Sequence, residues 1–139
     1  MKKIIIALAA VAGIVVALSS CCQSVDIAGE WSVTEVDGNA LPDLWEGQKA
    51  PFLSFDPAEN RMYGNTGVNI INSTYTLDGK NLEIGQAMST MMAGPDEWMK
   101  TEREIIDALG TVKTVKAVSS EKIELRDDSG KAVLTLVRK

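Results

Sequence analysis

The sequence predicts a mainly β fold of the α+β class: a small antiparallel, barrel-like sheet of about seven or eight short strands with one helix near residues 95–109. From Glu30 onward, turn-forming residues recur every eight to twelve positions, and the segments between them are short and alternately apolar. This spacing is typical of a closed or nearly closed antiparallel barrel. One segment, beginning at Gly94 and Pro95, has helical periodicity instead.

The first expected strand contains Trp31 and Val33 and ends at Asp37-Gly38-Asn39, a strong turn signal. Residues 40–50 are expected to form a loop into which Trp45 is tucked. Turn signals rich in Gly, Asp and Ser separate the segments that follow. The strands are therefore expected at residues 31–33, 52–55, 61–63, 75–77, 82–84, 112–118, 123–125 and 133–137.

The expected helix has clear start and stop signals. Gly94-Pro95-Asp96-Glu97 places proline in the first turn and two acids at the positive end of the helix dipole. Gly110 is expected to stop the helix. An apolar stripe runs along one face, with Met99 and Ile106 beside it, and should plug an end of the barrel. This stripe comprises Trp98, Ile105 and Leu109.

The amino terminus resembles a lipoprotein signal peptide. Lys2 and Lys3 precede a fifteen-residue apolar run, residues 4–18, which is too short to span a membrane as a helix. Leu18-Ser19-Ser20-Cys21 then resembles a lipobox, in which Cys21 becomes the lipidated first residue. Several acyl chains on Cys21 would anchor the protein stably. The alternative is an ordinary signal peptide followed by a chance cysteine.

These features divide the chain into a signal peptide at 1–20, a lipidated tether at 21–26 and one domain at 27–139. The residue after Cys21 is Cys22 and not aspartate, which by resemblance to enterobacterial sorting favours the outer membrane. No acidic run of the kind found in some surface-exposed lipoproteins follows. We therefore expect a lipid-anchored envelope protein that faces the periplasm.

Composition excludes several function classes. The chain has 14 basic and 19 acidic residues, and loss of Lys2 and Lys3 with the signal peptide would leave a net charge of −7. This sign argues against nucleic-acid binding, which depends on Lys and Arg neutralising phosphates. There is no histidine, which removes the commonest general base and most zinc and copper sites. We expect no cofactor, no metal and no catalytic residue, and adjacent Cys21 and Cys22 cannot staple the domain.

Glu102 is the most informative polar residue, because it lies on the apolar stripe between Trp98 and Ile105. A buried carboxylate needs hydrogen-bond donors. Glu102 is therefore either a general acid or ligand-binding group, or a structural acceptor, and the absence of histidine favours the structural interpretation. The expected donors are backbone N–H groups of the Gly64–Asn69 loop and the Asn69 side-chain amide. Asn69 and Asn72 could also fix a loop or contact a polar ligand.

Two further groups of residues have competing interpretations. Four methionines near Trp98 are expected mainly to fill the core, with a lipid or peptide groove as the alternative. They are Met88, Met91, Met92 and Met99. Asp127 and Asp128 are of the type that binds calcium, but without EF-hand spacing they are better interpreted as a hairpin turn.

Three stretches together resemble one known family. Gly64–Asn69 is similar to the glycine-rich region of the META domain (HslJ-like) family, and Thr90–Ala93 is similar to its T-M-A-C segment. Glu102 with Ile106 fits its helix, and the resemblance covers roughly residues 27–138. Val68 and Gly94 replace two cysteines common in the family, which excludes any role of those cysteines here. Their joint loss fits two positions that lie close in space.

The resemblance implies a β-rich, barrel-like fold with one helix and no established activity. Family members are associated with the heat-shock response, and the fold is similar to that of a lipid-binding secretion pilotin. The polar site to consider comprises Asn69, Thr90 and Glu102. The first hypothesis is a non-enzymatic envelope or envelope-stress lipoprotein that binds an envelope protein or lipid. The alternatives are a pilotin-like module that binds an acyl chain, and a hydrolase using Glu102 with a second acid.

Overall fold

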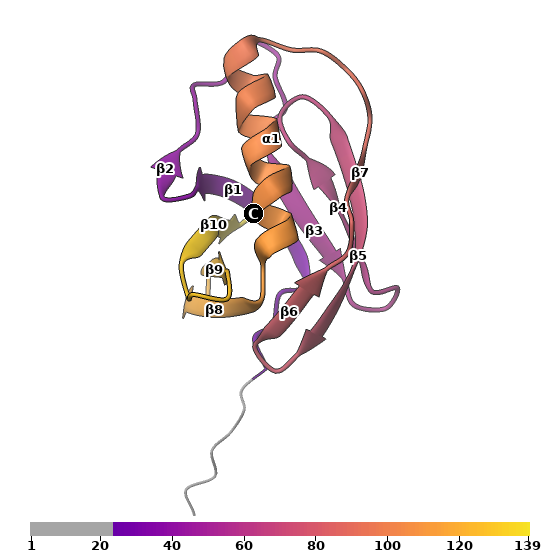
Figure 1. Cartoon of the computed structure of the whole chain (residues 1–139), viewed down its shortest axis with the longest axis vertical. Helices are drawn as coiled ribbons and strands as arrows, with labels where there is room; N and C mark the ends of the chain where they lie inside the picture. Colours follow the sequence, from indigo (N-terminus) through magenta and orange to yellow (C-terminus); the bar gives the residue numbers. More distant parts are fainter. Residues whose placement is uncertain (1–23) are drawn as a thin grey trace, which may run out of the picture.

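The computed structural model describes residues 24–139, so the expected signal peptide and the lipidation site at Cys21 lie outside the described residues. The described chain contains ten strands and one helix (Figure 1). They are β1 Gly29–Val36, β2 Asn39–Ala40, β3 Phe52–Asp56, β4 Arg61–Asn65, β5 Ile70–Asp78, β6 Asn81–Ile84, β7 Met88–Ser89, α1 Asp96–Thr111, β8 Thr114–Ser119, β9 Lys122–Arg126 and β10 Ala132–Arg138.

Eight of the strands form an antiparallel ring. Hydrogen bonding runs in the order β1-β3-β4-β5-β6-β8-β9-β10, and β10 pairs with β1 to close the ring. The two-residue strands lie off this path: β2 extends the edge of β1, and β7 pairs with β5 beyond the end of β6. The predicted mainly β, barrel-like fold with one helix is confirmed, and the two short strands are additions to it.

The ring has one narrow seam, between β6 and β8. Asn81 and Thr114 are the one residue pair in register there. Two backbone hydrogen bonds flank this pair, from Leu82 N–H to the Lys113 carbonyl at 3.0 Å and from Val115 N–H to the Lys80 carbonyl at 2.9 Å. After α1 the chain enters β8 beside the β5–β6 hairpin, and this seam joins β8 to β6.

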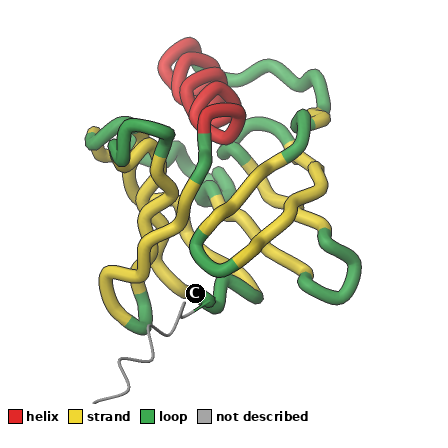
Figure 2. The backbone as a smooth tube through the Cα atoms, turned by 60° about the horizontal axis from the view of Figure 1, so that its bottom comes forward, coloured by secondary structure: helices red, strands yellow, loops and turns green. Residues whose placement is uncertain are grey.

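The helix lies across one end of the ring (Figure 2) and buries its apolar stripe there. Trp98, Ile105 and Leu109 are all buried, as the periodicity predicts. Every ring strand contributes to the same core, and burying a large apolar side chain stabilises the fold by about 1.5–3 kcal/mol. The core side chains include Trp31, Leu53, Met62, Ile71, Leu82, Val115, Ile123 and Leu134.

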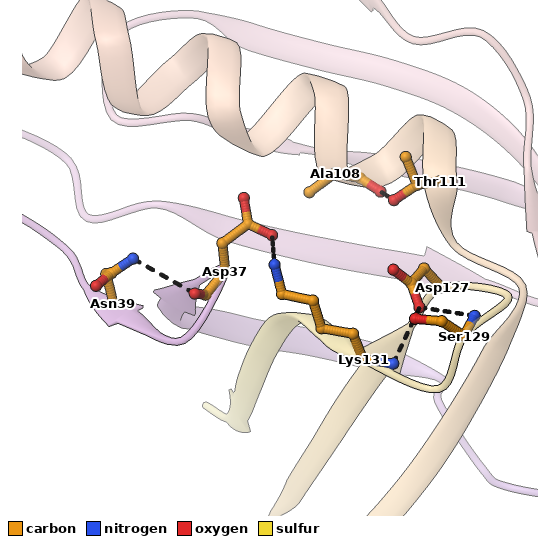
Figure 3. Close-up of polar contacts among 7 residues, drawn as sticks. All are labelled: Asp37, Asn39, Ala108, Thr111, Asp127, Ser129 and Lys131. Carbon is orange, nitrogen blue, oxygen red and sulfur yellow. Dashed lines mark hydrogen bonds and ion pairs between the residues drawn. The ribbon is translucent and has the colours of Figure 1, made fainter.

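The expected end of the helix, the expected start of β8 and the expected start of β5 were wrong. The helix continues through Gly110 to Thr111, whose hydroxyl donates to the Ala108 carbonyl at 2.8 Å (Figure 3). Val112 is the helix C-cap and is buried, so β8 begins two residues later than expected. Its burial explains why the helix ends there and not at the glycine. The third error lies in β5, which starts five residues before Tyr75.

Asp127 organises the last turn, which agrees with the hairpin interpretation of this acidic pair. Its carboxylate accepts hydrogen bonds from the Ser129 hydroxyl at 2.7 Å and from the Lys131 N–H at 2.9 Å (Figure 3). These bonds, the Ser129 hydroxyl above all, hold the pKa of Asp127 below its ordinary value. The Lys131 ammonium reaches Asp37 at 3.4 Å and so links this turn to the β1–β2 turn.

The chain joins the fold before residue 27. Val25 packs partly against the core, and its N–H donates to the Gly79 carbonyl at 3.4 Å. The described amino terminus therefore lies beside the β5–β6 turn, at the lower end of the molecule in Figure 1.

Candidate functional site

The helix places one carboxylate in the interior. Glu102 follows Trp98 by one helical turn on the face that packs against the ring, and 6% of it is exposed. Its carboxylate accepts a hydrogen bond from the Thr66 hydroxyl at 2.9 Å. The Asn69 side-chain amide lies 2.8 Å from both carboxylate oxygens. Such charge-assisted hydrogen bonds offset the cost of burying the acid.

The donors to Glu102 differ in part from those expected. The Asn69 amide is one of them, but the loop's backbone N–H groups turn elsewhere. Gly67 N–H donates to the Asn65 side chain at 2.6 Å, and the N–H groups of Val68 and Asn69 donate to the Thr66 hydroxyl oxygen. Sequence reasoning overlooked Thr66, although it lies within the recognised Gly64–Asn69 motif.

Asn69 connects the acid to the segment between β7 and α1. Its carbonyl oxygen accepts hydrogen bonds from the Thr90 hydroxyl at 2.8 Å and from Met92 N–H at 2.7 Å. Its amide nitrogen also donates to the Met92 carbonyl at 3.1 Å. Thr90 in turn accepts a hydrogen bond from Ile70 N–H through its hydroxyl. The structure thus brings together all three residues of the predicted polar site. Asn72 lies outside this site, on β5, where it pairs with Met88 of β7.

Glycines make room for this cluster. Gly67 has a φ of +97°, and a β-carbon there would lie 2.6 Å from the Trp98 ring. The loop can therefore approach the helix only with glycine at this position. The close approach is what brings Thr66 within reach of Glu102.

Three of the four methionines do not fill the core, which corrects the expectation. Met88, Met91 and Met92 are 73%, 95% and 61% exposed. Met99 is half-buried, and its sulfur accepts a hydrogen bond from Gly94 N–H at 3.3 Å. Asn69 holds the Met92 backbone and the Thr90 hydroxyl, and Met88 pairs with Asn72 on β5, so the segment lies along the outside of the ring. Leu44 and Trp45 are also partly exposed, and Trp45 lies edge-on to Trp98 beside Gly94.

The hollows of the described surface lie away from Glu102 and Asn69. Four hollows of about 330 to 510 Å³ in the described part of the molecule are lined by other residues, not by Glu102 or Asn69. One of them reaches Tyr75, whose pKa is raised by burial and by the nearby carboxylates of Asp56 and Asp26. Within residues 24–139, no cluster of three or more acidic or cysteine side chains could hold a metal ion.

No helix among the described residues is long and apolar enough to cross a membrane. The fold and site together define a small antiparallel β-ring protein. The one helix of residues 24–139 contributes a buried carboxylate, and through Asn69 this carboxylate supports the exposed segment that follows β7.

The META domain model matches residues 23–139, and the chain belongs to the META domain family. An NMR structure of a protein from Burkholderia xenovorans is similar, with a TM-score of 0.62 and 25% identity over 81% of this chain and 83% of that one. The crystal structure of a DUF4847 family protein from Bacteroides vulgatus has a TM-score of 0.58 and 15% identity, over 81% and 94% of the two chains. No curated protein matches this chain.

Val68 and Gly94, the two positions at which the resemblance implies family cysteines, are neighbours. A β-carbon at Gly94 would lie 3.1 and 3.2 Å from the two methyl groups of Val68. This proximity agrees with the inference from their joint replacement. In this chain a valine fills the space beside a glycine, so apolar packing joins the two segments at this point.

Proposed function

We propose that this protein is a lipid-anchored binding protein of the bacterial envelope, not an enzyme, and that it binds a protein partner through the exposed segment Met88–Met92. The proposal rests on the hydrogen bonds of Glu102. Its carboxylate is occupied by Thr66 and Asn69, and Asn69 in turn holds Met92. A general acid or base needs an oxygen that can reach its substrate.

The position of the segment supports a partner away from the membrane. Ile70, at the start of β5, bonds to Thr90, whereas Val25 bonds to Gly79, just past the end of β5. Nine residues of β5 separate these two ends by about 26 Å. If Cys21 carries the anchor, the membrane lies at the Val25 end and the methionines lie at the other (Figure 1).

The chemistry of the segment also fits protein binding. Methionine side chains are flexible and polarizable, and they are common on surfaces that accept varied apolar partners. A cluster of exposed large apolar side chains is typical of an interaction site. The described interior is filled by core side chains, so a pilotin-like acyl pocket is not what we propose.

The test is site-specific photocrosslinking of the full-length protein in its own membrane. A benzophenone-bearing residue at Met91 should give one adduct of defined mass. The matched control is Val118, which is also apolar and 49% exposed but lies next to the β8–β9 turn near the tether, and it should give no such adduct. Asn69→Ala should abolish the adduct at Met91 by releasing the segment. Absence of any adduct from Met91 in a folded protein would refute the proposal.

A further inference from the structure

A hollow of about 410 Å³ lies at the tether end of the ring, beside the β8–β9 turn. Its volume falls within the range of small-molecule sites. The charged side chains that line it are Asp26 and Arg138, and the hydroxyl groups are those of Ser24, Ser119 and Ser120. The exposed methionine segment does not line this hollow, which therefore takes no part in the proposed protein binding.

The Arg138 guanidinium is held in place but has no acidic partner. Its Cζ lies 4.2 Å from the centre of the Trp31 ring, and its Nη1 donates to the Ala28 carbonyl at 3.0 Å. No ion pair among residues 24–139 includes Arg138. A guanidinium has five N–H donors, so several remain free to bind an anion. Phosphate is the anion that matches this planar group best, together with carboxylate.

Serine hydroxyls supply further donors beside Arg138. The Arg138 backbone N–H donates to the Glu121 carbonyl at 2.7 Å, which holds the β8–β9 turn next to this arginine. Ser119 Oγ accepts a hydrogen bond from Glu121 N–H at 3.2 Å, so its own O–H proton is left to donate. Ser24 and Ser120 are exposed, and their hydroxyls can rotate toward a ligand. A phosphate in the hollow can therefore accept from arginine and serine together.

Asp26 gives the same hollow a negative charge. Its Oδ1 accepts the Ala28 N–H at 3.0 Å, and within the described residues Oδ2 accepts no hydrogen bond. Ala28 thus positions Asp26 through its N–H and Arg138 through its carbonyl, and the two charges form no ion pair with each other. Asp26 would repel a simple anion. A group that carries both a phosphate and an ammonium matches both charges.

We propose that this hollow binds the headgroup of a phosphatidylethanolamine lipid in the membrane that holds the anchor. The phosphate accepts hydrogen bonds from Arg138 and the serine hydroxyls, and the primary ammonium donates to Asp26. A choline headgroup is a poorer match because its quaternary ammonium has no N–H to donate. The inference rests on the lipid anchor of the proposed function and goes beyond it by adding a second, non-covalent contact with the membrane.

The place of the hollow favours a membrane lipid over a free phosphate. Ser24 lines it, and Cys21 is three residues away along the chain, a length of at most about 11 Å. Acyl chains on Cys21 would therefore hold the hollow close to the headgroup layer. A short tether gives an effective concentration in the millimolar range, so a headgroup site of only millimolar affinity would be occupied.

Amide NMR of the full-length protein in maltoside micelles, which contain no phosphate, would test the site with three soluble probes. They are glycerophosphoethanolamine, glycerophosphocholine and inorganic phosphate. Glycerophosphoethanolamine should shift the Ser119, Ser120 and Arg138 amide signals saturably at millimolar concentrations, and the other two probes should bind more weakly. The same signals should differ between nanodiscs of phosphatidylethanolamine and nanodiscs of phosphatidylcholine with no probe added.

Variants separate the two charges. Arg138→Gln should weaken binding of glycerophosphoethanolamine roughly tenfold or more, because a hydrogen bond between charged groups is lost. Lys139→Gln is the matched control, because Lys139 is the adjacent cation, pairs with Glu30 at 3.5 Å and does not line the hollow. It should bind as the parent does. Asp26→Asn keeps an acceptor for Ala28 N–H but removes the charge, so the ethanolamine and choline probes should bind alike.

Saturable, ethanolamine-selective shifts that Arg138→Gln weakens and Asp26→Asn makes unselective support the inference. Absence of the shifts, equal binding of inorganic phosphate or of the choline probe by the parent, or identical spectra in the two nanodiscs would each overturn it. If Arg138→Gln does not fold, the selectivity of Asp26→Asn decides. If the headgroup fails to bind while Cys21 is lipidated and Met91 still crosslinks, this inference fails and the proposed function stands. If lipidation and crosslink are also absent, both fail.

Discussion

Replacing Glu102 by alanine should lower the free energy of unfolding by about 2–4 kcal/mol. The change removes the acceptor of the Thr66 hydroxyl and of the Asn69 amide, and an unsatisfied buried donor costs about 1–3 kcal/mol. The Thr66 hydroxyl keeps a second acceptor, the backbone carbonyl of Asn69 at 3.3 Å, so its loss falls at the low end of that range. The Met92 carbonyl already takes one N–H of the Asn69 amide at 3.1 Å, so the other N–H is left without an acceptor and accounts for the larger share.

Glu102→Gln should cost less, about 1–2 kcal/mol, because one oxygen remains to accept from Thr66 and Asn69. Its new NH₂ group would replace the other oxygen, which lies 2.8 Å from the Asn69 amide nitrogen, so two donors would face each other. Because of this conflict, we expect the glutamine variant to be less stable than the parent protein. The parent should therefore be the most stable, Glu102→Gln the next and Glu102→Ala the least stable.

Thermal melts followed by circular dichroism would measure these effects, and the alanine variant should lose roughly 8–16 °C in Tm at about 4 °C per kcal/mol. Glu104→Ala is the matched control, because the Glu104 side chain is 44% exposed and pairs with Lys100 at 3.8 Å on the helix surface. It should change stability by less than about 0.5 kcal/mol. An unchanged Tm for Glu102→Ala, together with loss of the Met91 photocrosslink, would refute the structural role and favour direct ligand binding.

Three other predictions concern cysteine chemistry. The Tm of the unmodified protein should be the same with and without reductant, because residues 24–139 contain no cysteine; a fall of many degrees in reductant would contradict this. The double variant Val68→Cys, Gly94→Cys should form a disulfide and gain about 2–4 kcal/mol, a gain that reductant removes and that Val68→Cys alone does not show. Cys21→Ser should move the protein into the aqueous phase on detergent phase separation, and continued labelling of this variant by a fatty-acid probe would show that Cys21 is not the lipidated residue.

Local patterns account for the parts of the fold that the sequence predicts. Residues three and four positions apart share one face of a helix, so the sequence correctly predicts that Trp98 and Ile105 lie on the buried face. The ring strands follow from short alternating segments between turns, and their expected number, about seven or eight, matches the eight that close the ring. The exact ends were less predictable, since Val112 ends the helix through its burial against the core and no local signal marks that contact.

The candidate site was also predicted only in part. Periodicity placed Glu102 on the apolar face, and the need of a buried carboxylate for donors directed attention to the Gly64–Asn69 loop. The identity of the second donor, Thr66, depended on which way that loop turns. Its backbone N–H groups bond within the loop itself, to Asn65 and Thr66, and so are not available to the acid.

The sequence by itself determined the class of fold, the burial of the helix stripe and the acid on it, because these depend on the spacing of apolar residues along the chain. Only the tertiary structure decided that Met88, Met91 and Met92 lie outside. Composition favours burying methionine, but the Asn69 amide captures the backbone of Met92 and holds the segment as an edge strand. That bond joins residues 23 positions apart, and no local pattern in the sequence encodes it.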